Sequence, residues 1–539
     1  MQNFHLCAVL TALGLAISQT AGAATQVQDG ASATLAPSEL ASIGTVDERY
    51  QSYNVEMLEV TGGEFWKPYP QTAHPGAGAG APSGTTNDLP LEKDNSLRAY
   101  HPPIQLDSKR LRTLAAALGP AYVRVSGTAA NGVYLADSDT PLKSPPPGFE
   151  SVLTRARWQA VIDFAHAVDA QIVTSFAISA GTRDANGVWT PTQAQRFFDY
   201  TRSIGGRIAA AEFMNEPTLP TIGYAPAGYN AADYARDFKV FHDFVRQYAP
   251  DMRIAGPGAV GELSEELGPS VMDAIPGVIR TPALLAATGP NQVDIFSYHH
   301  YGAESLRCAG KGMPQTTADD ALSEAWLATT DQTLDYYRKL RDQYDPGKPL
   351  WITEVADTAC GGNPWASTFI DTFRYLDQLG RLARQHVQVI MHNTLAASDY
   401  GLLDHKTLEP RPNYWGAWLW RTFMGTTVLD TRIPIQEGLH AYAHCLRNTP
   451  GGVAVLAINN DKTRAGTLAI QGAASRYTLS APELLSRQVQ LNGTTLALGE
   501  GDALLPTLSG EHVGPGKISL APATITFLTF EKAGNKACR

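Results

Sequence analysis

The feature that most restricts the fold is a regular alternation of short apolar runs and amphipathic helical stretches between about residues 54 and 425. The runs contain few polar residues, which is typical of parallel strands that are covered by helices. Eight such runs occur, at 53–60, 121–125, 171–177, 210–214, 252–256, 293–298, 350–353 and 387–391. Eight alternating strand and helix units predict an α/β fold of the (β/α)8 TIM-barrel type.

The stretches between these runs place apolar side chains at helical spacing, as residues 158–168, 234–248 and 369–382 illustrate. A one-sided apolar stripe of this kind is the face with which a helix packs on a core. We therefore expect these side chains to pack on the barrel strands and not to bind a ligand.

From about residue 438 the apolar residues alternate with a period of two, as in 453–460 and 518–530, and turn residues separate the runs. This pattern predicts a β-sandwich of roughly 100 residues. Residues 25–46 alternate similarly in places and are a candidate for a further strand of the sandwich. The expected division is 1–23 signal peptide, 24–50 N-terminal segment joining the sandwich, 51–430 barrel and 431–539 sandwich.

An apolar run at residues 4–17 is too short to span a bilayer, and the small residues Ala21-Gly22-Ala23 follow it. Although no Lys or Arg precedes the run, this order predicts a cleaved signal and a secreted or periplasmic protein. The formal net charge of −10 weighs against nucleic-acid binding. No other stretch is apolar and long enough to predict a membrane partner.

Removal of the signal would take Cys7 away and leave four cysteines, Cys308, Cys360, Cys445 and Cys538. An even number in an exported chain favours disulfides, and four cysteines allow three pairings. We favour 308–360, in loops after apolar strands, and 445–538, which brackets the C-terminal region. Four buried free thiols are the alternative, and the spacing does not match a metal site.

Two glutamates follow predicted strands at the end where a barrel carries its chemistry. Glu216 lies in Asn215-Glu216-Pro217 after the fourth strand, and Glu354 ends the seventh. Two converging carboxyl groups can cleave a glycosidic bond by double displacement, if one is protonated and the other is ionised. Asn215 could then bind a sugar 2-hydroxyl, and Pro217 predicts an extended backbone at Glu216.

Each motif also has a structural interpretation. Asn-Glu-Pro can be an ordinary turn after a strand, and Glu354 can be a glutamate in a salt bridge at a strand end. Glu212 competes with Glu216, but its position in the middle of a strand predicts a structural or outward-facing side chain.

The sixth strand ends in Tyr298-His299-His300-Tyr301, which offers donors for a carboxylate or a sugar hydroxyl. Neighbouring residues of a strand point to opposite faces, so one of the two histidines is expected to pack in the core. The same alternation, and the lack of a matching third ligand, disfavour a metal site there.

The stretch from Leu350 to Asp430 contains five segments that are specific in their order and spacing. They are Thr-Glu-Val-Ala-Asp-Thr-Ala-Cys-Gly-Gly-Asn-Pro (353–364), Phe-Arg-Tyr-Leu-Asp-Gln-Leu-Gly (373–380), Asp-Tyr-Gly-Leu-Leu-Asp (399–404), Leu-Glu-Pro-Arg-Pro-Asn-Tyr-Trp (408–415) and Phe-Met-Gly-Thr (423–426). With these segments, the stretch resembles the heparanase-like, β-glucuronidase family of retaining glycosidases, glycoside hydrolase family 79. The resemblance also extends to Asn215-Glu216-Pro217 and to the loop at His299.

The resemblance implies that Glu216 is the acid/base and Glu354 the nucleophile, and that Cys445–Cys538 is a family disulfide. It also implies that Gly361-Gly362 lets backbone N–H groups approach a uronate carboxylate, since glycine allows close approach. The other sugar contacts that it implies are Tyr400, Glu56 and the segment 126–128 with Thr128.

The chain departs from the family pattern just before the glycines, where Ala359-Cys360 replaces an aromatic residue and a Cys308–Cys360 bridge would be an addition. Lys311 is a candidate cation for the uronate and is equally plausible as a solvated loop residue.

The resulting hypothesis is a retaining β-glucuronidase that needs no cofactor or metal and acts on a glucuronide or a uronic acid-containing glycan. A β-xylosidase or endo-β-glycanase of the same clan is one alternative, and a catalytically inactive carbohydrate-binding protein is another. Exo or endo action, the glycan itself and the oligomeric state stay open at this stage.

Overall fold

A computed structural model describes residues 30–70, 95–262, 276–309, 315–499 and 505–539. The signal peptide expected at 1–23 and the candidate Lys311 lie outside these described residues. In the described residues, no helix has the length and apolar character needed to cross a membrane.

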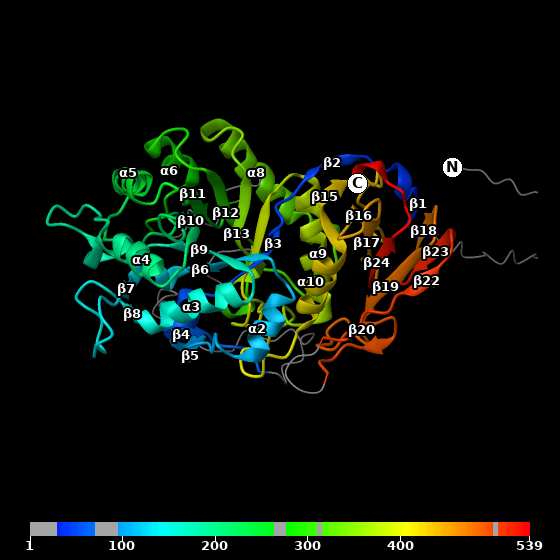
Figure 1. Cartoon of the computed structure of the whole chain (residues 1–539), viewed down its shortest axis with the longest axis horizontal. Coiled ribbons are helices and arrows are strands. Elements are labelled where there is room, and N and C mark those ends of the chain that lie inside the picture. Colours follow the sequence, from blue (N-terminus) through cyan, green and yellow to red (C-terminus); the bar gives the residue numbers. More distant parts are fainter. Residues whose placement is uncertain (1–29, 71–94, 263–275, 310–314, 500–504) are drawn as a thin grey trace, which may run out of the picture.

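Eight parallel strands close into a barrel, which confirms the predicted TIM-barrel fold (Figure 1). Starting from the first strand of the chain, their order around the barrel is also their order in the sequence. They are β3 (Gln51–Asn54), β6 (Ala121–Val125), β9 (Ala170–Ser175), β10 (Ile208–Glu212), β11 (Arg253–Ala259), β12 (Ile295–Glu304), β13 (Leu350–Ala359) and β14 (Val389–His392).

The predicted boundaries hold to within a few residues for most strands, but the first one is wrong. Instead of continuing to residue 60, β3 ends at Asn54 and helix α1 (Met57–Thr61) follows. The backbone N–H of Glu56 donates to the Glu59 carboxylate at 2.8 Å, which caps this short helix. An apolar run alone does not separate a buried strand from a buried helical turn.

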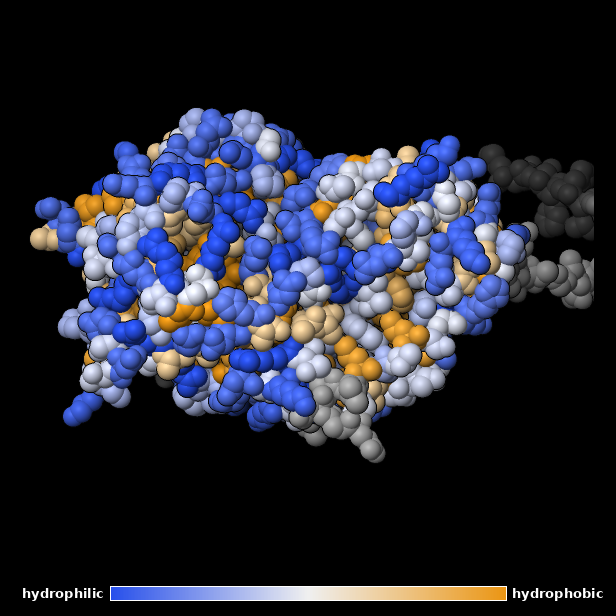
Figure 2. Space-filling model, in the orientation of Figure 1, coloured by the Kyte–Doolittle hydropathy of each residue, from blue (hydrophilic) through white to orange (hydrophobic). Residues whose placement is uncertain are grey.

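Helices cover the outside of the barrel, and their apolar stripes are buried as predicted, for example Trp158, Phe238 and Phe373. Hydrophilic residues predominate on the face in Figure 2, where hydrophobic residues form small separate groups. The helices are α2 (Lys109–Ala116), α3 (Arg155–Ala167), α4 (Thr192–Ser203), α5 (Ala231–Tyr248), α6 (Thr281–Thr288), α7 (Glu324–Leu327), α8 (Thr329–Tyr344), α9 (Phe369–Arg384) and α10 (Pro412–Phe423).

Two short sheets extend from this frame after the first two barrel strands. One pairs β4 (Gly63–Trp66) with β5 (Arg98–His101), and the other pairs β7 (Val133–Leu135) with β8 (Ser151–Leu153). The 3-10 helix η4 (Thr128–Gly132) leads from β6 into β7. These additions belong to the loops that follow the carboxyl ends of β3 and β6, the end at which TIM barrels carry their sites.

Two further sheets pack face to face beside the barrel, and each includes one strand from the N-terminal segment. The smaller is β1 (Ser32–Leu35), β18 (Gly466–Ile470) and β23 (Gly516–Leu520). The larger is β2 (Ser42–Thr45), β15 (Met424–Leu429), β16 (His440–Leu446), β17 (Val453–Asn459), β24 (Thr524–Phe530), β19 (Ala474–Ser480), β20 (Gln490–Leu491) and β21 (Thr494–Thr495), with β22 (Glu511–Val513) on β19. The predicted sandwich with an added N-terminal strand is therefore present.

Helix α9 lies between the barrel and the larger sheet, and its residues 369–383 are all buried (Figure 1). Its polar groups find partners on the sheet side: Asp377 accepts hydrogen bonds from Tyr442 and His440 of β16, both at 2.5 Å. His440 also contacts Glu324 at 2.7 Å. A buried ionic network therefore joins barrel and sheet.

Both favoured disulfides are formed in the structure. Cys308–Cys360 connects the loop after β12 with the end of β13. Cys445–Cys538 connects β16 with the C-terminal 3-10 helix η9 (Lys536–Cys538). The first bridge therefore constrains the rim that carries Gly361, and the second closes the sandwich.

Candidate active site

Glu216 and Glu354 meet at the carboxyl end of the barrel, together with His299. One side-chain oxygen or nitrogen from each of the three lies within 4.8 Å of the other two. In the ladder between β12 and β13, His299 is paired with Glu354, so their side chains lie on the same face. The Nδ1 of His299 is 3.0 Å from Glu216 and 3.7 Å from Glu354.

Glu216 has a left-handed backbone with φ of 49°, so the extended conformation predicted from Pro217 is wrong. A non-glycine residue rarely adopts this conformation, and such residues gather at functional sites. The pKa of Glu216 is raised by burial and by the charge of Glu354, while the His299 hydrogen bond acts to lower it. The net direction favours the protonated form that a general acid needs.

Donors surround the Glu354 carboxylate. Arg124 Nη1 donates at 2.8 Å, the Tyr301 hydroxyl at 2.5 Å and Asn393 Nδ2 at 3.4 Å. These three donors hold the carboxylate in a fixed position. This environment suits a nucleophile, in contrast to the surroundings of Glu216.

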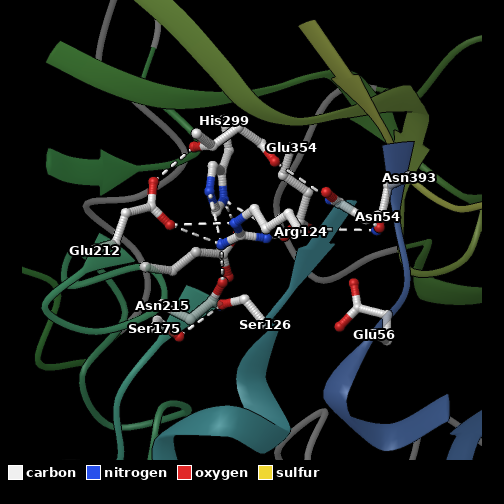
Figure 3. Close-up of polar contacts among 12 residues, drawn as sticks. Asn54, Glu56, Arg124, Ser126, Ser175, Glu212, Asn215, His299, Glu354 and Asn393 are labelled. Carbon is white, nitrogen blue, oxygen red and sulfur yellow. Dashed lines mark hydrogen bonds and ion pairs between the residues drawn. The ribbon is translucent and has the colours of Figure 1, made fainter. Parts of the chain in front are cut away.

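Arg124, in the middle of β6, is the main residue of the site that sequence reasoning missed. It is fully buried and donates to Glu212 at 2.9 Å and to Asn215 Oδ1 at 2.7 Å, in addition to Glu354 (Figure 3). Burial lowers its pKa, but the charges of Glu212 and Glu354 more than compensate and raise it above the ordinary value. The signal in the sequence was a single cation inside the apolar run 121–125, because a buried charge needs partners.

Glu212 has a structural role, but the prediction that it could face outward is wrong. It points into the barrel and accepts hydrogen bonds from Arg124, from Ser297 Oγ at 2.8 Å and from Thr353 Oγ1 at 2.6 Å. Burial raises its pKa, but Arg124 and these donors bring it below the ordinary value. Glu212 is therefore a buried counter-charge for Arg124.

The Arg124 contact also indicates the tautomer of His299. Arg124 Nη2 lies 3.3 Å from His299 Nε2, and a guanidinium can only donate. His299 Nε2 therefore accepts, which leaves the ring hydrogen on Nδ1 for donation to Glu216.

Only half of the run at 298–301 reaches the site. His299 and Tyr301 face the glutamates, whereas Tyr298 stacks on Tyr337 of α8 with ring centroids 4.5 Å apart. His300 faces away as well, and burial together with the Arg374 charge lowers its pKa to about 3. Tyr298 and His300 were candidates for substrate binding and are core residues instead. For His300 this agrees with the expectation that one of the two histidines packs in the core, because neighbouring strand residues alternate between faces.

Glu56 is buried beside the site, at the end of β3 (Figure 3). Gly127 makes room for it, since a Cβ at that glycine would lie 1.5 Å from Glu56 Oε2. Burial and the charge of Glu354 raise the pKa of Glu56. Thr128 follows Gly127 as the half-buried first residue of η4, so the structure places the loop 126–128 against Glu56.

Cys360, Gly361 and Gly362 form a tight turn after β13 with φ values of 59°, 83° and 86°. A Cβ at Gly361 would lie 2.4 Å from Ser398 Oγ and 2.5 Å from Trp66 Cβ. A Cβ at Gly362 would come within 3.0 Å of the Tyr400 backbone nitrogen. Both glycines are thus required by close packing of the protein itself, a reason that the sequence did not show.

Tyr400 is buried and joined to the site through Asn393, which sequence reasoning also missed. Asn393 Nδ2 donates to the Tyr400 hydroxyl at 3.2 Å and to the Tyr301 hydroxyl at 3.0 Å. Its Oδ1 accepts from Asn54 at 3.2 Å. The only sequence feature that could have pointed to Asn393 was its position as a polar residue just after the eighth predicted strand.

A metal ion has one candidate position in the described part of the chain, the group Glu216, His299 and Glu354. An ion there would lie beside the permanent charge of Arg124, which already bonds Glu354 and His299. A metal cation and the Arg124 guanidinium carry like charges, and neighbouring like charges in a buried site repel each other strongly. The donor set therefore fits two carboxylates with a cationic side chain better than a bound metal.

The barrel, with two carboxylates at its carboxyl-terminal rim, has the architecture of a glycoside hydrolase. Residues 147–380 match the glycosyl hydrolase family 79 N-terminal domain. This segment of the chain therefore resembles that family's domain, and the resemblance inferred from the sequence is confirmed.

The chain is 27% identical to Arabidopsis thaliana heparanase-like protein 2 over 60% of its length and 57% of that relative. It is 30% identical to baicalin-beta-D-glucuronidase of Scutellaria baicalensis over 64% of its length and 63% of the relative. The alignments thus span less than two thirds of these relatives. Human inactive heparanase-2 is 23% identical over 84% of this chain and 74% of that protein.

Among solved structures, a Fusarium oxysporum 4-O-α-L-rhamnosyl-β-D-glucuronidase superposes with a TM-score of 0.60. The match covers 93% of this chain and all of that one, at 15% identity. At this identity the likeness confirms the fold alone.

Proposed function

We propose that the protein is a retaining β-glycosidase that hydrolyses β-glucuronides. The observation that carries the proposal is the approach of Glu216 and Glu354 to within 4.8 Å. Retaining enzymes hold their two carboxyl groups roughly 5 Å apart, whereas inverting enzymes leave roughly 6.5–9.5 Å for a water molecule. Opposite environments of the two groups support a division of roles between acid and nucleophile.

In the first step, the Glu354 carboxylate attacks the anomeric carbon and forms a covalent glycosyl-enzyme. The glycosidic bond breaks at the same time, and Glu216 gives its proton to the departing oxygen. Arg124 and Tyr301 hold the carboxylate oxygens of Glu354 in place by hydrogen bonds. Asn215 binds Arg124 through Oδ1, which leaves its Nδ2 to donate to the sugar 2-hydroxyl.

In the second step, Glu216 is ionised and takes a proton from a water molecule that attacks the anomeric carbon. The bond to Glu354 breaks, the sugar leaves with its configuration retained, and both carboxyl groups return to their first states. His299 donates to Glu216 at 3.0 Å, which stabilises the ionised acid between the two steps.

The glucuronide preference rests on the turn Gly361-Gly362 and on Tyr400, which lies against that turn and next to the nucleophile network. Positive φ at three successive residues makes a tight turn, and successive backbone N–H groups in a turn can bind an anion. The names of the Scutellaria relative and of the Fusarium structure give both as glucuronidases, which supports the same substrate class for this chain.

The test is hydrolysis of an aryl β-glucuronide by the wild type and by Glu354→Ala and Glu216→Ala. Both variants should lose at least a thousandfold in kcat/KM, and a mechanism-based label should react with Glu354. Activity that survives both substitutions would refute the assignment. An aryl β-xyloside separates the β-xylosidase alternative, because it lacks the carboxylate.

A second candidate is a carbohydrate-binding protein without catalysis, which the likeness to human inactive heparanase-2 makes worth testing. Glu216 and Glu354 face each other here, which favours catalysis. Binding of glucuronides without release of the aryl group or reaction with the label would establish the binding protein instead.

A further inference from the structure

We propose that Asn393 is a positioning residue that directs the hydroxyl hydrogens of Tyr301 and Tyr400 and thereby favours a uronate over a neutral sugar. The inference rests on the proposed function, because it concerns how the same pocket selects its substrate. Asn393 follows β14 and is 2% exposed.

One amide nitrogen serves three groups of the site. Asn393 Nδ2 lies 3.0 Å from the Tyr301 hydroxyl, 3.2 Å from the Tyr400 hydroxyl and 3.4 Å from Glu354 Oε1. These groups come from β12, from the loop after β14 and from β13. Asn393 therefore couples the nucleophile to the tyrosine assigned to the uronate pocket.

The orientation of the amide follows from its partners. Asn54 Nδ2 donates to the Thr353 backbone carbonyl at 3.2 Å, and a carbonyl can only accept. The Asn54 nitrogen is thereby fixed, and it also donates to Asn393 Oδ1 at 3.2 Å. With its oxygen held on that side, Asn393 must turn its nitrogen toward Glu354, which as a carboxylate also only accepts.

This orientation sets the direction of both hydroxyl groups. Tyr301 accepts from Asn393 and donates to Glu354. Tyr400 also accepts from Asn393, so its own hydrogen points elsewhere. In the described residues the Tyr400 hydroxyl donates no hydrogen bond, although the Glu56 carboxylate lies near enough to interact with it electrostatically. Its hydrogen is therefore available to a ligand in the pocket.

Because Asn393 occupies its acceptor side, the Tyr400 hydroxyl offers a ligand only a hydrogen-bond donor, and this distinguishes a uronic sugar from a neutral one. A uronate carboxylate can only accept, so it is served by Tyr400 as Asn393 orients it. The primary alcohol of a neutral sugar can accept or donate, and it depends less on this direction. Aspartate at position 393 keeps the shape of the side chain but replaces the donor by an acceptor, which would reverse the Tyr400 hydroxyl.

The experiment compares kcat/KM for 4-nitrophenyl β-glucuronide and 4-nitrophenyl β-glucoside. Asn393→Asp should lower the glucuronide-to-glucoside ratio roughly tenfold to a hundredfold, the value of a hydrogen bond to a charged group. Tyr400→Phe should lower it similarly, and the double variant should lower it no further. Asn186→Asp, the same substitution in an exposed loop, should leave the ratio unchanged.

A merely structural role would reduce both activities together and leave the ratio unchanged, and that result would overturn the inference. Additive effects in the double variant would also overturn it, since Asn393 would then act without Tyr400. If Asn393→Asp does not fold, Asn393→Ala with and without Tyr400→Phe completes the same cycle. A wild type without glucuronidase activity overturns the proposed function and this inference together, whereas an unchanged ratio in an active enzyme overturns the inference alone.

Discussion

Replacement of Arg124 by methionine should destabilise the fold by about 3–5 kcal/mol, the range for a buried ion pair that loses one partner. The Arg124 and Glu212 side chains are fully buried and that of Glu354 is 8% exposed. Methionine fills a similar volume but leaves these two carboxylates without their cation. Glu212 keeps its bonds to Ser297 and Thr353, so part of its charge stays compensated.

A second substitution separates charge from packing. Glu212→Gln in the Arg124→Met background replaces the buried charge by a neutral amide of the same shape. We expect it to recover roughly half of the lost stability, because one of the two unpaired carboxylates has been removed. Activity should stay at least a hundredfold low in both variants, since Glu354 still lacks the guanidinium that holds it.

Urea unfolding at constant pH measures these differences, and aryl glucuronide hydrolysis is followed in parallel. Arg110→Met is a matched control, because Arg110 forms an ion pair with Glu409 whose side chains are 27% and 60% exposed. That pair should contribute less than about 1 kcal/mol. If Arg124→Met were as stable as Arg110→Met, or if Glu212→Gln recovered nothing, the electrostatic reasoning would be wrong.

Three further predictions concern pH and packing. Burial lowers the pKa of His440, but Asp377 and Glu324 raise it to about 9. The protonated His440 therefore contributes about 3 kcal/mol to the free energy of unfolding, a contribution that is complete below pH about 6.5 and lost as pH rises through about 9. Urea unfolding from pH 6 to 10 should show this loss in the wild type but not in His440→Gln. Because the pKa of Glu216 is raised, kcat/KM should fall as pH rises through that value, and Glu216→Ala assayed with an activated aryl leaving group should lack this alkaline limb. Gly361→Ala should destabilise the fold by about 2–4 kcal/mol, because the added Cβ clashes with its neighbours and the φ of 83° is unfavourable for alanine. Gly187→Ala should lose only about 1–2 kcal/mol, because Gly187 has a similar φ of 75° but nothing within 4 Å of the added Cβ. Equal losses of stability in urea unfolding would contradict a role for the clash.

The barrel could be predicted because its signals are local. Parallel strands covered by helices carry apolar residues at nearly every position, as in 121–125 and 350–353, and the covering helices carry one-sided stripes. The predicted end of the first strand was wrong for an equally local reason. Apolar residues at 57–60 fit a buried strand or a buried helical turn, and the cap formed by Glu56 and Glu59 decided for the helix.

The candidate site was predictable in part. Alternation along β12 implied that His299 and His300 face opposite ways, but it did not say which of them faces inward. Tyr298 was assigned to the wrong face, and Arg124 was overlooked because a cation within an apolar strand has no visible partner in the sequence. Its partners Glu212 and Glu354 come from strands that are distant in the chain and adjacent to the same interior.

The sequence by itself determined the order of strands and helices, the rim at which Glu216 and Glu354 stand and the chemistry that their side chains allow. These properties follow from residue type and short-range periodicity, which are written along the chain. Only the tertiary structure decided that Arg124 lies between Glu212 and Glu354, that His299 reaches Glu216 and that Asn393 holds two tyrosine hydroxyls. Those contacts depend on the register and closure of eight strands, because barrel closure brings together side chains that no local pattern relates.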